Sequence, residues 1–174
     1  MGDVRLRILL ALLGLLSVSA TCRGSDNGLG LARVDRPLPA LAGRTVQGSE
    51  VTPADYADHV LVVNFWATWC GPCREEQPAL QQVWAQYRDR GVDFVGVNYR
   101  DDAAAAGAWI DEFGVTYPSI ADAAGGWADD FALRGAPTTF IADATGRIRY
   151  LITGAVGADE LSSVLDGMLT TASP

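Results

Sequence analysis

The chain has 174 residues, of which 49% are hydrophobic and 20% charged, a composition typical of one globular domain with a short appendage. The formal net charge is -8, and all thirteen cations are arginine because the sequence contains no lysine. An acidic surface repels phosphate groups, and no basic run occurs beyond Arg5 and Arg7, so nucleic acid is not an expected partner.

The first 21 residues read as a targeting segment. Arg5 and Arg7 precede an uncharged, leucine-rich run over 8–20, which is shorter than a typical transmembrane helix. Cleavage after Ala20 would release the protein, retention of the segment would leave a membrane anchor, and cleavage before Cys22 would make that cysteine a site of lipidation. Each outcome places the domain outside the cytoplasm, with the two arginines left inside.

Residues 22–36 are rich in Gly, Ser, Asn and Asp without hydrophobic periodicity, which predicts a flexible tether, and the folded domain is expected over 37–174. Strand and helix patterns then alternate, and a hairpin and a helix close the chain. The expected strands are 60–66, 92–97, 117–121, 138–142 and 148–153, and the expected helices are 72–88, 103–113, 126–133 and 158–169. This order predicts an α/β fold with a mixed central sheet flanked by helices.

The domain holds one cysteine pair, Cys70 and Cys73, where a buried strand ends and a helix begins. Unpaired amide groups and the helix dipole favour an anion at this position, so we expect an exposed thiolate at Cys70 and a shielded Cys73 one turn further on. Pro72 suits the first helical turn, because the N–H that it lacks would have no helical partner. The pair predicts thiol-disulfide exchange, in which Cys70 attacks a disulfide and Cys73 resolves the mixed disulfide.

Other interpretations of the cysteine pair fit less well. Structural zinc needs about four ligands, whereas the domain offers two cysteines and His59, so no metal is expected. No cofactor is expected either, because the redox-active group is the Cys70-Cys73 disulfide itself. A structural disulfide closed over two residues would remove little chain entropy. A peroxidase of the peroxiredoxin type would have a proline before its reactive cysteine, and no such proline precedes Cys70. A non-catalytic module holding a partner or copper is the remaining class; the intact pair and the lack of a nearby His or Met argue against it.

A family resemblance covers most of the chain. The segment 65–73, Phe-Trp-Ala-Thr-Trp-Cys-Gly-Pro-Cys, resembles the active-site segment of the thioredoxin superfamily. Asn64 before it and 74–78 after it resemble the exported branch that contains the TlpA and ResA-type thiol-disulfide oxidoreductases. The segments 117–125 and 135–140 also resemble that branch. The resemblance implies a thioredoxin-like fold with an extra strand-helix segment in the middle.

The resemblance implies how a substrate would bind. In these proteins the proline that matches Pro137 is cis and faces the cysteine pair, which would leave the backbone of Ala136 free to pair with an extended substrate segment. We also expect Trp69 to border the substrate groove, together with Gly71 and Pro72 between the cysteines.

Proton transfer is assigned to a glutamate by the same resemblance. Thioredoxin has a buried aspartate at the position of Asn64, and asparagine cannot titrate. In ResA-like proteins a glutamate matching Glu76 acts near the cysteines, and Cys73 and Glu76 at i and i+3 share a helix face. A partly buried Glu76 would have a raised pKa and could serve as acid or base. The alternative is a solvated helix residue like Glu75.

The direction of electron flow is predicted from the dipeptide between the cysteines. Gly-Pro is also found in the reducing thioredoxin, at about -270 mV, whereas the oxidant DsbA lies near about -120 mV. We therefore expect a reductase of exported protein disulfides. The resemblance implies apocytochrome thiols in cytochrome c maturation as one substrate, and a membrane thiol-disulfide carrier as electron donor. The alternative is an oxidase that introduces disulfides into secreted proteins.

Overall fold

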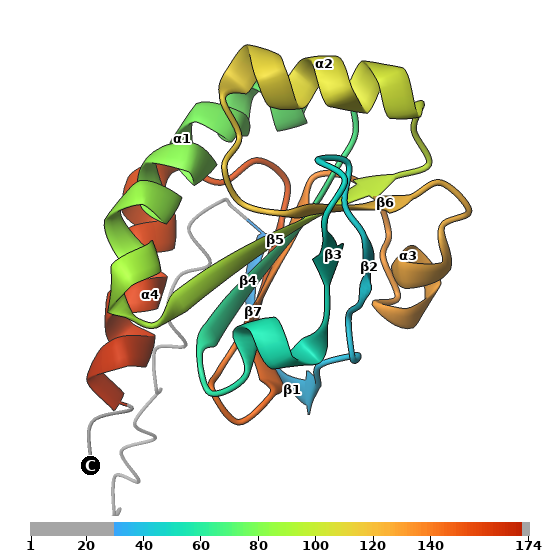
Figure 1. Cartoon of the computed structure of the whole chain (residues 1–174). Coiled ribbons are helices and arrows are strands. Elements are labelled where there is room, and N and C mark those ends of the chain that lie inside the picture. The colour runs from blue at the N-terminus through green and yellow to red at the C-terminus, as the bar shows by residue number, and fades with distance from the viewer. Residues whose placement is uncertain (1–29, 172–174) are drawn as a thin grey trace, which may run out of the picture.

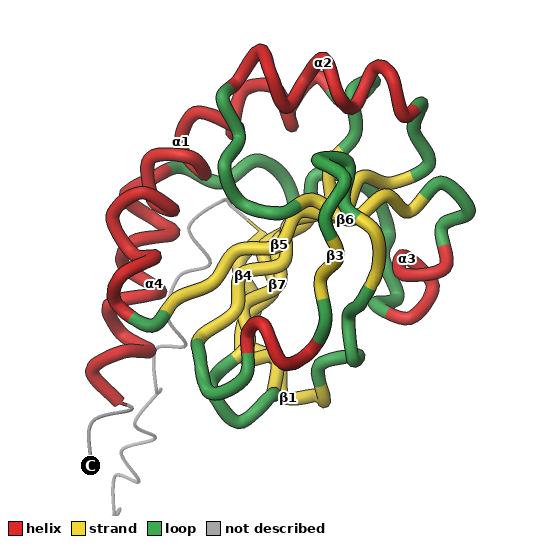
Figure 2. Tube along the Cα trace, viewed as in Figure 1, coloured by secondary structure: helices red, strands yellow, loops and turns green. Residues whose placement is uncertain are grey.

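The computed structural model describes residues 30–171, which form a six-stranded sheet with helices packed around it (Figures 1 and 2). The strands of the sheet are β1 (Gly30–Pro37), β4 (Val60–Trp66), β5 (Val92–Tyr99), β6 (Ser119–Asp122), β7 (Thr138–Ala142) and β8 (Arg147–Thr153). Their order is β1-β8-β7-β4-β5-β6, with β4, β5 and β6 parallel and the remaining pairs antiparallel. The expected mixed sheet flanked by helices is confirmed.

Four α-helices surround this sheet. They are α1 (Gly71–Tyr87), α2 (Ala103–Phe113), α3 (Gly126–Asp130) and α4 (Ala158–Thr171). A separate small sheet pairs β2 (Gly43–Arg44) with β3 (Glu50–Val51), and short 3-10 turns occur at Pro53–Tyr56 and Arg88–Arg90. In Figure 1, α1 and α4 lie side by side on one side of the sheet, while β2, β3 and α3 lie on the other. Strand β6 and helix α3 form the expected strand-helix segment between α2 and β7.

Strand β4 is buried along its whole length and separates two hydrophobic cores. Successive side chains of a strand point to opposite faces. Val62 and Trp66 accordingly pack in the core that holds residues of α1, α2 and α4, whereas Val63 and Phe65 pack in the core beneath β2, β3 and α3. Asn64 has the same parity as Val62 and Trp66, so this polar side chain points toward the face covered by α1.

The main departure from the sequence prediction lies at the start of the domain. Residues 30–36, expected in the tether, belong to strand β1, which pairs antiparallel with β8. No residue of this edge strand is fully buried, so no hydrophobic periodicity marks it in the sequence. The expected targeting segment 1–21, Cys22 and the rest of the tether lie outside the described residues. Within 30–171, no helix is long and apolar enough to cross a membrane.

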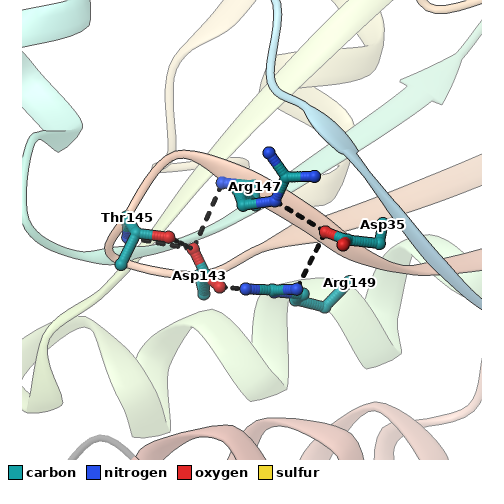
Figure 3. Close-up of polar contacts among 5 residues, drawn as sticks. All are labelled: Asp35, Asp143, Thr145, Arg147 and Arg149. Atoms are coloured by element: carbon teal, nitrogen blue, oxygen red, sulfur yellow. Dashed lines mark hydrogen bonds and ion pairs between the residues drawn. The ribbon is translucent and has the colours of Figure 1, made fainter.

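Charged side chains reinforce the attachment of β1, as Figure 3 shows. Asp35 on β1 accepts hydrogen bonds from Arg147 Nε at 2.6 Å and Arg149 Nη1 at 2.8 Å, both on β8. Asp143, in the turn between β7 and β8, accepts from Arg149 Nε at 2.5 Å and from the backbone N–H and hydroxyl of Thr145. The network joins β1 to the β7-β8 hairpin.

The two aspartates of this network are expected to differ in their effect on stability. Asp143 accepts four hydrogen bonds in a tight turn and its side chain is 22% exposed, so Asp143→Ala is expected to lower the free energy of unfolding by about 1–2 kcal/mol. Asp35 is 59% exposed and its ion pairs are screened by water, so Asp35→Ala is expected to cost less. Urea unfolding at pH 7 measures both variants, and a larger loss for Asp35→Ala would contradict this assignment.

Candidate active site

The cysteine pair lies at the junction of β4 and α1, as the sequence predicts. Cys70 is the N-cap of α1 and forms a disulfide with Cys73. The backbone N–H of Cys73 donates a hydrogen bond to Cys70 Sγ at 3.2 Å, which satisfies one of the free amide groups of the first turn. The same donor, together with the helix dipole, would stabilise a thiolate on Cys70 once the disulfide is reduced.

The exposure of Cys70 differs from the prediction, whereas Cys73 is shielded as expected. Cys70 is 4% exposed and Cys73 is 1% exposed, so in the disulfide form both are buried. The disulfide draws the Cys70 sulfur against Cys73, and both residues join the core beneath α1. The exposed hydrophobic side chain at the site is that of Trp69, at 58%.

The structure places the residues predicted to contact a substrate on α1 and on the segment before β7. Gly71 and Pro72 form the first turn of α1 and are exposed. The peptide bond between Ala136 and Pro137 is cis, as the resemblance implies, and Ala136 packs against the core that contains both cysteines. Strand β7 pairs with its neighbours only from Thr138 onward, so Ala136 precedes the hydrogen-bonded part of the strand.

The loop before Cys70 is held by the segment between β5 and α2, which the sequence analysis missed. The carboxylate of Asp101 accepts hydrogen bonds from the backbone N–H and the hydroxyl of Thr68, at 2.6 and 2.7 Å. It also accepts from Asn98 Nδ2 at 2.9 Å. The indole N–H of Trp69 donates to the carbonyl oxygen of Arg100 at 3.3 Å. These contacts fix the position of Trp69 relative to the disulfide, and nothing in the sequence near Asp101 identifies them.

Glu76 is a buried residue of α1, three positions after Cys73. It is 2% exposed, whereas its neighbour Glu75 is exposed, so the alternative of a solvated Glu76 is wrong. One carboxylate oxygen, Oε1, accepts from Asn64 Nδ2 at 2.9 Å, and the other, Oε2, accepts from the backbone N–H of Val156 at 3.0 Å. Burial raises the pKa of Glu76 to about 7, although both hydrogen bonds act in the opposite direction. Glu76 can therefore take up or release a proton near neutral pH.

Two further predictions concern histidine and metal. His59 is half exposed and its Nδ1 lies 2.7 Å from Asp93 Oδ2, which agrees with its expected place at the surface. In the part of the chain that the structure describes, no three His, Cys, Asp or Glu side chains are arranged to hold a metal ion.

The model of the Redoxin family matches residues 33–169. The chain belongs to the Redoxin family. It is 37% identical over 147 residues to the thiol:disulfide interchange protein DsbE of Pseudomonas fluorescens biotype C, which covers 81% of this chain and 80% of that protein. It is 30% identical over 121 residues to the thiol-disulfide oxidoreductase ResA of Oceanobacillus iheyensis, which covers 70% of this chain and 63% of that protein.

Solved structures agree with this Redoxin assignment. A secreted thiol-disulfide isomerase from Corynebacterium glutamicum has a TM-score of 0.72 and 26% identity to this chain, covering 84% of this chain and 94% of that one. Together with the DsbE and ResA relatives, this structure confirms the expected thioredoxin-like fold and the class of thiol-disulfide oxidoreductase.

Proposed function

We propose that this Redoxin family member is an extracytoplasmic disulfide reductase that acts on exported proteins through Cys70 and Cys73. The observation that carries the proposal is the disulfide at the N-terminus of α1, with the Cys73 N–H directed at Cys70 Sγ. The Gly-Pro dipeptide between the cysteines, shared with the reducing thioredoxin, supports the direction of electron flow.

The first step is the attack of Cys70 on the substrate. With the pair reduced, the Cys70 thiolate forms a bond to one sulfur of a substrate disulfide, and the bond between the two substrate sulfurs breaks. The second substrate sulfur leaves as a thiolate and takes a proton from water. The product is a mixed disulfide between Cys70 and the substrate.

The second step resolves this mixed disulfide and uses Glu76. The thiol of Cys73 transfers its proton to the Glu76 carboxylate, one helical turn further along α1. The Cys73 thiolate then forms a bond to Cys70 Sγ, and the bond from Cys70 to the substrate breaks. The substrate leaves as a thiolate and is protonated, so two electrons pass from the cysteine pair to the substrate. A pKa near 7 allows Glu76 to accept this proton and then return it.

Substrate binding is assigned to the surface around the disulfide. An extended substrate segment would pair with the backbone of Ala136 beside Pro137 and pass over Gly71 and Pro72. Trp69, whose ring is exposed and held by its N–H, would supply the apolar contact. Backbone pairing suits many sequences, so this surface fits a reductase of several exported proteins.

The targeting segment predicted over residues 1–21 supports a location of the reaction outside the cytoplasm. Residues 1–21 would export the domain as a signal peptide or hold it as an anchor, Cys22 would carry a lipid if the chain is cut before it, and 22–29 would act as a tether. A secreted relative in Corynebacterium glutamicum supports this location. The electrons would come from a membrane thiol-disulfide carrier. Apocytochromes awaiting haem attachment are the proposed substrates, on the strength of the ResA-like sequence.

The reduction potential of the Cys70-Cys73 pair tests the direction. The protein is equilibrated against glutathione or dithiothreitol buffers, and the oxidised fraction is measured by thiol alkylation. We expect a value near or below about -270 mV, as in thioredoxin. A value close to about -120 mV, as in DsbA, would overturn the proposal of a reductase and favour an oxidase that introduces disulfides into secreted proteins.

A further inference from the structure

Asn64 is the polar residue in the middle of the buried strand β4 and is 1% exposed. Burial of an amide is unfavourable unless its polar atoms are hydrogen-bonded. The two N–H bonds of Asn64 Nδ2 are directed at Glu76 Oε1, 2.9 Å away, and at Thr139 Oγ1, 3.1 Å away. The Oδ1 atom of the same amide is buried and has no hydrogen-bond partner among residues 30–171. Asn64 therefore offers two donors to its neighbours and leaves its acceptor unused.

This orientation of the amide suits an ionised Glu76. A carboxylate has only acceptor oxygens, so the Nδ2 group pairs with it and the Oδ1 atom would be repelled. A protonated Glu76 has an O–H group that needs an acceptor. A half-turn of the Asn64 amide exchanges Nδ2 and Oδ1, so that Oδ1 accepts from a proton on Oε1 and Nδ2 moves to the buried position where Oδ1 has no partner among residues 30–171. The turned state thus exchanges an unpaired acceptor for unpaired N–H donors, and the hydrogen bond from the protonated Glu76 to Oδ1 has to offset that cost. Thr139 fits both orientations, because its hydroxyl can either accept or donate.

We propose that Asn64 is a positioning residue whose amide turns by half a rotation when Glu76 gains or loses a proton. The turn keeps Oε1 of Glu76 hydrogen-bonded in both protonation states, so the carboxyl group does not need to leave the core. In the ionised state Asn64 Nδ2 donates to Glu76, and in the protonated state Glu76 donates to Asn64 Oδ1. The benefit for catalysis rests on the proton transfer proposed above, whereas the turn itself is a property of the oxidised protein.

The groups around Glu76 leave the amide as the side chain that responds to its charge. Cys73 is held in the disulfide, and burial raises the pKa of Tyr117 far above its usual range, so this phenol stays neutral. Gln77, the next residue on α1, is paired with the Tyr117 hydroxyl. The contact from the loop between β8 and α4 is the backbone N–H of Val156. No ion pair of the described residues involves Glu76.

The rotation of the Asn64 amide is tested by NMR titration of the full chain with its disulfide intact. The 13C signal of the Glu76 carboxyl reports its protonation, and the side-chain 15N–1H signals of Asn64 report their hydrogen bonds. We expect both to change with the same midpoint near pH 7, and the Asn64 signals to stop responding in that range in Glu76→Gln. Asn64 signals that stay constant while Glu76 titrates would overturn the proposal.

A pair of matched variants separates this role from general packing. Asn64→Leu removes the donor to the ionised Glu76 and the acceptor to the protonated one. Because hydrogen bonds to charged groups are the stronger, the pKa of Glu76 is expected to rise by about one pH unit. The control is Asn98→Leu, which removes a buried asparagine of β5 whose Nδ2 donates to Asp101 instead. In Asn98→Leu the pH midpoint of the Glu76 titration is expected to stay unchanged. Equal shifts of this midpoint in the two variants would overturn the specific role of Asn64.

The pH profile of disulfide exchange distinguishes this inference from the proposed function. If Glu76 accepts the Cys73 proton, Asn64→Leu moves the inflection of the rate toward higher pH by the same amount as the NMR midpoint. An NMR shift without a change in the rate profile would retain the amide turn and refute the proton step. A rate profile that depends on Glu76, with an Asn64 amide that never titrates, would refute the amide turn and retain the proton step.

Discussion

Replacing Cys73 with serine is expected to leave Cys70 covalently linked to its substrates. The Cys70 thiolate can still attack a disulfide, but a serine hydroxyl cannot displace it, so the mixed disulfide accumulates. Multiple turnover is expected to be lost, because each enzyme molecule stays linked to the first substrate that it attacks. Non-reducing electrophoresis and mass spectrometry of the adduct measure the trapped species, and an insulin reduction assay measures the turnover.

The complementary variant provides the control. Cys70→Ser retains Cys73, which lies inside the first turn of α1 and is 1% exposed, so it is expected to trap nothing and to be inactive. Both variants are made with Cys22→Ser, since Cys22 is the remaining cysteine of the chain. If both trap equal amounts of substrate, or if Cys73→Ser is folded and traps none, the assigned roles of the two cysteines are wrong.

The fold was predictable where burial leaves a continuous or a periodic run of hydrophobic residues. The apolar run 60–66 is the fully buried strand β4, and the expected helix 103–113 has the bounds of α2. The prediction for residues 30–36 was wrong because this edge strand is only partly buried. Leu31 and Val34 pack against the two cores, and backbone pairing with β8 and ion pairs such as that of Asp35 with Arg147 hold the strand without a regular hydrophobic pattern.

The site was predictable to the extent that its residues lie close together in sequence. The positions of Cys70, Cys73 and Glu76 on α1 follow from one segment and its helical spacing. The contacts of Val156 and Asp101 depend on the tertiary fold, because one acts through a backbone N–H and the other reaches across from the loop after β5. The burial of Cys70 in the disulfide form was also missed, since helix position alone does not specify what covers a sulfur atom.

Protein stability is expected to decrease as pH rises from 4.5 to 7, and Glu76 is the main cause. Burial raises the pKa of Glu76 from 4.5 to about 7, so the folded protein holds this proton more tightly than the unfolded chain does. The stabilisation is fully present below pH 4.5 and is lost as pH rises through 7. The difference of about 2.5 pH units corresponds to roughly 3 kcal/mol in the free energy of unfolding.

Urea unfolding of the oxidised protein between pH 4.5 and 8 measures this loss, and two neighbouring variants isolate its source. Glu76→Gln cannot titrate, so most of the dependence is expected to disappear, whereas Glu75→Gln changes an exposed carboxyl and is expected to keep it. Burial also raises the pKa of Glu160, which acts in the same direction but is present in both variants, so their difference belongs to Glu76. Hydrogen bonds lower the pKa of Asp35, Asp55 and Glu112, and for Asp101 and Asp143 burial raises the pKa but is outweighed by several hydrogen bonds. These five carboxyls favour folding with rising pH only in more acidic solution. An unchanged pH dependence in Glu76→Gln would show that the buried carboxyl does not hold its proton at neutral pH, and would remove the basis for its proposed exchange with Cys73.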